Sequence, residues 1–238
     1  KHVAIPTTAG TGAEATKFAV CYDNGKKCSI EDETLLPDYV VLDGNLLKEL
    51  PLYQKKCTIM DALSQSIESI LSRNSNEISE KYAINSIKII LDNIYKYIDN
   101  NESLDLVLKG SNYSGRAINI SKTTASHAMS YNITSLCNIP HGHAVALTIP
   151  YLLEYLENNC NNEDLRRKLD LLNNLFNGKC YEEFLKIFDY LELNRPIINE
   201  DDLVKLINSV NIERLANTPI NLSKDTIEKI YRKSLIIK

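Results

Sequence analysis

The spacing of apolar residues divides the chain into two unequal parts. In the first fifty residues, short runs of β-branched and aromatic residues at 3–5, 18–22 and 39–42 are separated by Gly, Asn-Gly and Leu-Pro-Asp turn signals. Such runs predict strands. From Lys55 onward, apolar residues recur at three- and four-residue spacing, which is typical of amphipathic helices. The pattern therefore predicts a mainly α fold with a small N-terminal β portion.

The helical part is divided by polar breaks into separate segments. The predicted helices cover residues 57–71, 77–98, 104–120, 123–133, 144–156, 164–175, 181–191, 201–210 and 224–234. Ser223 and the Asn199-Glu200 pair stand directly before two of them, where such residues cap helix N-termini. The three short strands, by contrast, make a poor free-standing sheet. We therefore expect them to pair with a preceding segment, so that the chain is truncated at its N-terminus.

Composition and charge exclude several classes of protein. The 238 residues, 44% apolar and 24% charged, are enough for one large core or two smaller ones. A net charge of −4 and a pI near 5.7 argue against a nucleic-acid partner. The longest apolar runs are too short to span a membrane, and no signal-like segment opens the chain. We expect a cytoplasmic protein whose six cysteines, without a Cys-x-x-Cys pair, are reduced and mostly buried.

A glycine-rich turn, Pro-Thr-Thr-Ala-Gly-Thr-Gly-Ala-Glu at residues 6–14, follows the first apolar run. Glycines let a ligand approach the backbone closely, and the hydroxyls of Thr7, Thr8 and Thr11 can donate to phosphate or ribose oxygens. No third glycine follows at the spacing of the dinucleotide fingerprint Gly-x-Gly-x-x-Gly. The residues alone leave two interpretations open, a phosphate or nucleotide site and a tight turn without a ligand.

The histidines are gathered in one segment. Of four histidines, His127, His141 and His143 lie within seventeen residues. His127 belongs to a predicted helix, and His141 follows Pro140 at a predicted helix start. Two histidines from adjoining helices and a carboxylate from elsewhere would make a usual site for a divalent metal.

The best candidate for that carboxylate is Asp61. It interrupts an apolar helix face, where an unpaired charge is costly, and Gln65 shares this face one turn later. Each residue has a structural explanation when taken singly: a hydrogen-bonded core histidine, or an aspartate that caps a helix. Taken together, the grouping of histidines in a histidine-poor chain favours the metal site.

Five segments resemble the iron-containing (group III) alcohol dehydrogenases in order and spacing, and the similarity runs from Val3 to the C-terminus. Residues 6–16 are similar to the family's nucleotide-contacting segment, and residues 36–43 to the strand after it. Residues 60–68 are similar to its first metal-ligand helix, and residues 127–129 and 139–142 to its other ligand segments. The resemblance implies a dehydroquinate synthase-like, iron-dependent alcohol dehydrogenase fold. Residues 1–50 would be the C-terminal remnant of an α/β nucleotide-binding domain, and residues 51–238 an all-helical, metal-binding catalytic domain.

The resemblance also implies cofactors and residue roles. The metal would be Fe²⁺, with Zn²⁺ as the alternative, and the hydride carrier NAD or NADP. Gln65 stands where the family usually has a ligand histidine, and Tyr131 where it has a histidine thought to relay protons. A homodimer that acts on a small aldehyde or alcohol is expected. The implied metal ligands are Asp61, Gln65, His127 and His141, and the implied proton donors are Tyr131 and His143. The implied cofactor contacts are Thr7, Thr8, Thr11 and Lys27. The implied substrate contacts are Phe18, Arg116, Ile118 and Lys122.

Within the family, residues 15–20, 52–56, 126–131 and 140–147 resemble the phosphonoacetaldehyde reductases, which form 2-hydroxyethylphosphonate. A dianionic substrate needs cations, and Arg116 and Lys122 lie upstream of His127. A solvated helix face explains these two cations equally well. Two alternatives to this function stay open: a dehydroquinate synthase-like or glycerol dehydrogenase-like metalloenzyme, and an inactive truncated helical fragment.

Overall fold

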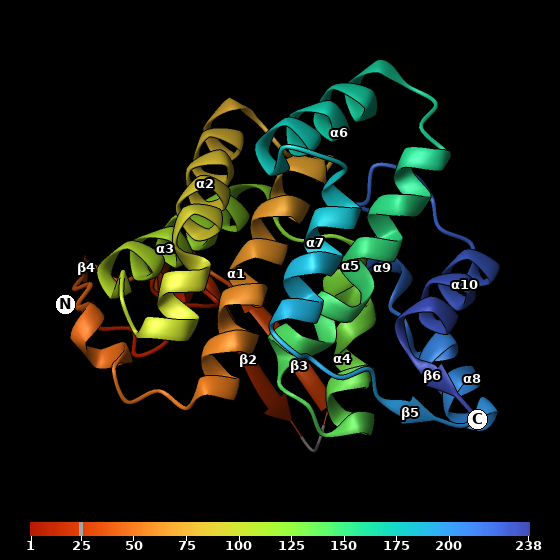
Figure 1. Ribbon diagram of the computed structural model, residues 1–238, viewed down its shortest axis with the longest axis horizontal. Coiled ribbons are helices and arrows are strands. Elements are labelled where there is room, and N and C mark those ends of the chain that lie inside the picture. Colours follow the sequence, from red (N-terminus) through yellow and green to blue (C-terminus); the bar gives the residue numbers. More distant parts are fainter. Residues whose placement is uncertain (24–25) are drawn as a thin grey trace.

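Helices make up most of the molecule, as the spacing of apolar residues predicts (Figure 1). The computed structural model describes residues 1–23 and 26–238, apart from the side chains of residues 21–23, 26–29, 212 and 213. Its helices are α1 (Leu52–Leu71), α2 (Glu77–Asn100), α3 (Leu104–Ser121), α4 (Ala125–Cys137), α5 (His141–Asn158), α6 (Glu163–Phe176), α7 (Cys180–Tyr190), α8 (Glu200–Ser209), α9 (Ile212–Leu215) and α10 (Lys224–Ser234). The predicted mainly α fold is confirmed.

The predicted helices all form, and their ends differ from the expected positions by a few residues. Two caps are confirmed: the Ser223 hydroxyl accepts from the Thr226 amide at the start of α10, and the Asn199 side chain accepts from the Asp202 amide at the start of α8. The single-turn helix α9 was not predicted, because four residues are too few to show a helical period. This short helix carries a residue of the candidate site.

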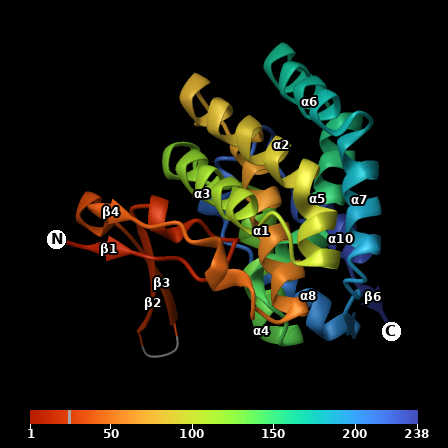
Figure 2. The ribbon, with the colours of Figure 1, turned by 60° about the vertical axis from the view of Figure 1, so that its left-hand side comes forward.

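The N-terminal part contains two small pairs of strands. Strand β1 (Val3–Ala4) pairs in parallel with β4 (Tyr39–Val40), and β2 (Phe18–Asp23) forms an antiparallel hairpin with β3 (Lys26–Glu31). Short 3-10 helices lie between β1 and β2 (η1, Ala13–Ala15) and between β3 and β4 (η2, Glu33–Leu35), and a third, η3 (Gly44–Leu47), lies between β4 and α1. Figure 2 shows this part extending from the helical body on the side of the N-terminus. Strand β3 was not predicted, because its residues are mostly polar.

Helix α1 lies at the centre of the helical body, with α2 and α3 on one side and α5 on the other (Figure 1). Every residue from Ile59 to Leu71 is buried, including Asp61, Gln65 and Glu68. A helix buried around its whole circumference is normally apolar all round, because an uncompensated buried charge is costly. The buried polar side chains of α1 therefore require partners from the helices around it.

Among the described residues of 51–238, the helices and their connecting loops are joined by one small strand pair. Strand β5 (Ile197–Ile198), before α8, pairs in parallel with β6 (Ile236–Ile237), after α10. The prediction of an all-helical segment missed these strands, because two residues carry no strand periodicity and the pairing joins segments far apart in the chain. The pairing fastens the last residues of the chain to the helical body.

Two expectations about the whole chain can be compared with the structure. Cys57 and Cys180 are buried, Cys137 and Cys160 are half-buried, and all four are free thiols, as predicted; the side chains of Cys21 and Cys28 lie outside the described residues. Over the described part of the chain, no helix has the length and apolar character needed to cross a membrane.

Candidate metal centre

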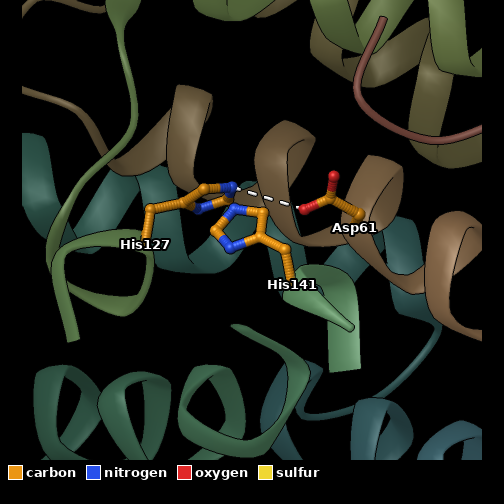
Figure 3. Close-up of side chains that lie close together, drawn as sticks. All are labelled: Asp61, His127 and His141. Atoms are coloured by element: carbon orange, nitrogen blue, oxygen red, sulfur yellow. Dashed lines mark ion pairs between the residues drawn. The ribbon is translucent and has the colours of Figure 1, made fainter. Parts of the chain in front are cut away.

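Asp61, His127 and His141 come together from three helices (Figure 3). Asp61 lies in the middle of α1, His127 in the first turn of α4, and His141 is the first residue of α5. One ligand atom from each of the three lies within 4.8 Å of the others. Asp61 and His127 are buried and His141 is half-buried, so His141 is the member of the cluster that is partly exposed to solvent. The structure thus brings together the carboxylate and two histidines singled out in the sequence.

Gly142 allows α5 to begin against α1. A Cβ atom at this position would lie 2.1 Å from the Cys57 carbonyl oxygen and 2.8 Å from Asp61 Cβ. Both neighbours belong to the buried centre of α1, which cannot give way easily. The absence of a side chain at Gly142 therefore sets how closely His141 approaches Asp61.

Two polar atoms of the cluster are buried and make no hydrogen bond. They are Asp61 Oδ1 and His127 Nε2, which lie 3.5 Å apart. Leaving a buried donor or acceptor unsatisfied costs roughly 1–3 kcal/mol, and more for a charged group. A divalent cation bound by carboxylate and imidazole would satisfy both atoms, and Asp-His-His is a donor set that Fe²⁺ and Zn²⁺ accept. These residues therefore fit the metal that the sequence implies.

Hydrogen bonds on the outer nitrogens orient both imidazoles. His127 Nδ1 bonds to Glu68 Oε2, a carboxylate oxygen that can only accept, so Nδ1 carries the proton. The Ser130 hydroxyl donates to the His127 carbonyl oxygen, which leaves its oxygen to accept from His141 Nδ1 at 3.4 Å. In both rings this leaves Nε2 as the candidate ligand atom, and for His127 the pattern is the carboxylate–histidine–metal arrangement of known sites.

Glu68 is a residue of the site to which the sequence pattern assigned no role. Its side chain is fully buried, and its Oε1 accepts from the Thr124 hydroxyl at 2.6 Å and from the Ser126 amide at 2.9 Å. The carboxylate of α1 thus caps the N-terminus of α4, where a negative charge is favourable, and holds the His127 ring. A carboxylate seven residues after Asp61, on the same helix face, was the available signal.

The charges within the cluster stabilise one another. Burial acts to raise the pKa of Asp61, but its interactions with His127 and His141 outweigh burial and lower that pKa below its ordinary value. Burial acts to lower the pKa of His127, but the carboxylates of Glu68 and Asp61 outweigh it and raise that pKa. Two carboxylates around one imidazole therefore make this pocket favourable for a positive charge.

Gln65 holds a different position from that of a direct ligand. Its Nε2 donates to Asp61 Oδ2 at 3.3 Å, and its Oε1 accepts from the Ser114 hydroxyl at 2.6 Å. Turning the amide over would set its oxygen against a carboxylate oxygen, and both atoms can only accept. The amide oxygen therefore faces Ser114 of α3, and the side chain orients the Asp61 carboxylate from behind.

A cavity of about 420 Å³ opens beside His127. Three of the implied substrate contacts, Phe18, Ile118 and Lys122, line it, and Lys122 Nζ lies 2.6 Å from Glu31 Oε2. Tyr131 also lines it, with its ring stacked on that of His141 at 5.8 Å between centroids. The cavity therefore joins His127 to four of the residues that the sequence assigned to substrate or proton transfer.

Two of the implied residues lie elsewhere. His143 accepts from the Tyr53 hydroxyl at Nδ1 and donates from Nε2 to the Asn194 carbonyl oxygen, because α5 turns it to the side away from His127. Arg116 is on the surface of α3, where its Nε bonds to Asn112 Oδ1 and its guanidinium lies over the Tyr82 ring. Neither side chain lines the cavity, which corrects their expected roles in proton transfer and in substrate binding.

The glycine-rich turn packs against the protein's own helices. A Cβ at Gly12, whose φ is +59°, would lie 2.6 Å from Gly115 Cα of α3, and one at Gly10 would lie 2.8 Å from Thr58 Cβ of α1. The glycines are therefore explained by this close approach. Thr7 and Thr11 are exposed and Thr8 is half-buried, so their hydroxyls can still meet a ligand. The side chain of Lys27, the fourth implied cofactor contact, lies outside the described residues.

Arg214 is a further residue of the cavity that the sequence did not indicate. It comes from α9, and its Nη1 donates to the Tyr131 hydroxyl at 2.6 Å while its guanidinium lies over the Tyr131 ring at 4.7 Å. No motif or periodicity marks this position, because α9 reaches the cavity through the packing of distant helices.

Solved structures share this fold. An iron-containing alcohol dehydrogenase from Thermotoga maritima superposes with a TM-score of 0.88 and 31% identity, covering 98% of this chain and 63% of that one. A sulfoacetaldehyde reductase from Bifidobacterium kashiwanohense, in complex with NAD⁺, gives a TM-score of 0.89 and 26% identity, covering 97% and 63%. The dehydroquinate synthase-like, iron-dependent alcohol dehydrogenase fold predicted from the sequence is confirmed.

The sequence comparisons define the family. The model of the Fe-containing alcohol dehydrogenase family, C-terminal, matches residues 56–235, and that of the iron-containing alcohol dehydrogenases matches residues 1–44. The chain therefore belongs to the iron-containing alcohol dehydrogenase family, as its motifs indicate.

Curated relatives show how the chain compares with whole proteins of the family. A phosphonoacetaldehyde reductase of Streptomyces viridochromogenes is 35% identical over 158 residues, which cover 64% of this chain and 40% of that protein. Long-chain-alcohol dehydrogenase 1 of Geobacillus thermodenitrificans is 28% identical over 250 residues, which cover 96% and 62%. The chain thus spans about two fifths and about three fifths of the length of these two relatives.

Proposed function

We propose that this chain carries the metal-binding catalytic part of an NAD(P)-linked aldehyde reductase or alcohol dehydrogenase. The observation that carries the proposal is the pair of buried, unsatisfied atoms Asp61 Oδ1 and His127 Nε2, which lie with His141 beside a cavity. Membership of the iron-containing alcohol dehydrogenase family supports the same reaction class. We propose Fe²⁺, with Zn²⁺ as the alternative, as the metal and NAD or NADP as the hydride carrier.

The protein's own residues would divide the work of the reaction as follows. Asp61, His127 and His141 would hold the metal, which when bound supplies Lewis-acid polarisation of the substrate carbonyl. Glu68 and Ser130 fix the two imidazoles, so the ligand set needs little rearrangement on binding. Phe18 and Ile118 line the cavity with apolar surface that excludes water from the reacting carbon.

Tyr131 is the residue we propose as proton donor. Burial raises the pKa of its phenol, although the nearby Arg214 acts to lower it, so Oη keeps its proton at neutral pH. The ring stacks on His141 and lines the cavity, within the region where the substrate oxygen would become an alkoxide. Tyr131 can therefore serve as a general acid in the reductive direction. Thr7, Thr8 and Thr11 are the proposed cofactor contacts.

The metal assignment is tested with His141→Ala in the full-length protein. We expect the variant to lose stoichiometric metal, measured by elemental analysis after gel filtration, and to lose nicotinamide-dependent reduction of a small aldehyde. The matched control is His143→Gln, two residues further along α5, which removes a histidine that does not line the cavity and should keep its metal. Full metal occupancy in His141→Ala would contradict the proposed ligand set.

The same measurement separates the two rivals. A dehydroquinate synthase-like lyase would bind metal but show no net hydride transfer to an aldehyde. An inactive helical fragment would bind no metal even in the wild-type protein.

A further inference from the structure

Lys122, the residue after α3, has a backbone conformation that lysine rarely adopts. Its φ is 60° and its ψ is 173°, a combination that is populated essentially by glycine alone. Four other non-glycine residues with positive φ have ordinary left-handed helical angles, with ψ between 26° and 46°: Asn101, Ser103, Asn138 and Asn177. Lysine at position 122 therefore costs folding free energy that a glycine would not cost.

Hydrogen bonds on both sides of Lys122 hold this conformation. Its amide donates to the Ile118 carbonyl oxygen at 2.8 Å, which ends α3. Its own carbonyl oxygen accepts from the Ser121 hydroxyl at 3.1 Å, and Asn217 Nδ2 donates to the Thr123 carbonyl oxygen at 2.9 Å. A glycine could make the same backbone bonds without strain, so the turn between α3 and α4 does not account for a lysine side chain.

The side chain of Lys122 lines the same cavity as His127. Its Nζ lies 2.6 Å from Glu31 Oε2 and 6.0 Å from the centre of the Phe18 ring. The side chains of Lys122 and Glu31 are 50% and 40% exposed, so solvent screens their ion pair, which stabilises the fold by less than the backbone strain costs. Within the described part of the chain, Nζ makes its hydrogen bond to Glu31 alone, and an ammonium has three donors. Two donors are thus available to a ligand in the cavity.

We propose that Lys122 determines specificity by binding the anionic group of the substrate, which would be a short aldehyde with a phosphonate, sulfonate or carboxylate. The inference rests on the proposed function and assigns the substrate class of the same cavity. With the carbonyl at the metal ligands, the carbon chain would lie against Phe18 and Ile118, and the anion would meet the ammonium. Lys17 Nζ lies 3.6 Å from Glu31 Oε1, so Glu31 keeps a cation when Lys122 turns to the substrate.

The test uses Lys122→Gly in the full-length, metal-loaded enzyme, because glycine removes the ammonium and also relieves the backbone. Ethylphosphonate, ethanesulfonate and propanoate carry the three anionic groups but no aldehyde to reduce. Calorimetry should show the preferred anion binding about ten- to a hundredfold more weakly to Lys122→Gly than to wild type, as expected for the loss of one charge-assisted hydrogen bond. The urea midpoint of unfolding should equal or exceed that of wild type. Equal affinity of the two proteins for all three anions would overturn the proposal.

Glu31→Gln should give a gain of affinity that a purely structural ion pair cannot give. With the competing carboxylate removed, we expect the preferred anion to bind about two- to fivefold more tightly, which is the range set by a half-exposed ion pair. The double variant, Glu31→Gln with Lys122→Gly, should lose this gain. Weaker or unchanged binding in Glu31→Gln would overturn the proposal, because Lys122 would then serve Glu31 and not the substrate.

The matched control is Glu192→Gly. Glu192 also has a positive φ, 53°, and its carboxylate pairs with a lysine, Lys56, at 3.4 Å, but it borders a different surface pocket. Its replacement should leave the affinity for all three anions unchanged. A tenfold loss in Glu192→Gly as well would overturn the assignment to Lys122, because the anions would then depend on the fold as a whole.

Steady-state kinetics keep this inference separate from the proposed function. In an active enzyme, Lys122→Gly should lower kcat/KM for the aldehyde with the preferred anionic group more than kcat/KM for propanal, by about the factor lost in affinity. Equal losses on both aldehydes would overturn the role of Lys122 and leave the proposed function standing. A wild-type enzyme that binds the anion through Lys122 but reduces no aldehyde would instead overturn the proposed function and leave the anion site standing.

Discussion

At the scale of single residues, the buried carboxylates of α1 act as a pair with separate tasks. Asp61 presents an unsatisfied oxygen to the two histidines, whereas both oxygens of Glu68 are satisfied by α4. The difference follows from their neighbours: Glu68 faces the amide groups that begin α4, and Asp61 faces imidazole nitrogens. A carboxylate saturated by hydrogen bonds orients a ligand, and an unsaturated one is suited to bind a cation.

Replacing Glu68 tests this division. We expect Glu68→Gln to weaken metal binding by about 10- to 100-fold, because the neutral amide no longer raises the basicity of His127 or fixes its tautomer. Affinity would be measured by competition with a chelator. Glu14→Gln is the matched control, since Glu14 is also a buried carboxylate but bonds to Asn112 of α3. Unchanged metal affinity in Glu68→Gln would limit Glu68 to capping α4.

At the scale of elements, the centre depends on how closely α5 and α4 approach α1. The first residue of α5 is the proposed ligand His141, and the second, Gly142, lacks the side chain that would hold the helices apart. Two of the three proposed ligands, His127 and His141, therefore sit at helix starts, where the direction of a side chain depends on the entry angle of the whole helix. Gln65 and Ser114 add a hydrogen-bonded link from α3 to the Asp61 carboxylate.

Gly142→Ala is expected to damage the centre through this helix contact. Overpacking a filled core costs about 1–3 kcal/mol, so the urea midpoint of unfolding should fall. Metal affinity should fall as well, because α5 must move His141 away from Asp61. The control is Gly178→Ala, where an added Cβ would meet the end of the flexible Glu183 side chain at 3.0 Å. A stable Gly142→Ala protein with wild-type metal affinity would show that α5 can shift without moving His141.

At the scale of the whole molecule, His143 joins distant parts of the chain. Its ring links Tyr53 at the start of α1, the first turn of α5, and the Asn194 carbonyl in the segment before β5. Burial lowers the pKa of His143, and the bond to Asn194 only partly opposes this effect. The folded protein therefore holds this imidazole neutral.

This neutral histidine makes a prediction about stability and pH. Because the folded-state pKa lies below the ordinary value of about 6.5, the unfolded chain takes up the proton first as the pH falls below that value. The stabilising contribution of His143 is thus complete above about pH 6.5 and declines towards the lower folded-state pKa. Urea unfolding on either side of this pH should show a smaller acid loss in His143→Gln, whose amide can donate and accept at the same partners. An equal loss in both proteins would contradict the buried neutral state.

The sequence by itself determined the helices and singled out the three residues that form the candidate metal cluster. Helical periodicity depends on residues three and four apart, and the ligand motifs are contiguous, so both are visible without a fold. The sequence also singled out Lys122 and Tyr131, which line the cavity. It singled out Arg116 in the same way, although Arg116 lies outside the cavity.

Only the tertiary structure decided which side chains meet. Glu68 and Thr124, Gln65 and Ser114, and Tyr131 and Arg214 are each separated by about fifty residues or more, so no local pattern relates them. Their contacts arise because α1 is buried on every side and must find a partner for each polar group it carries. The rotation of α5 likewise turns His141 to the cluster and His143 away from it, a choice set by the packing of Gly142 against α1.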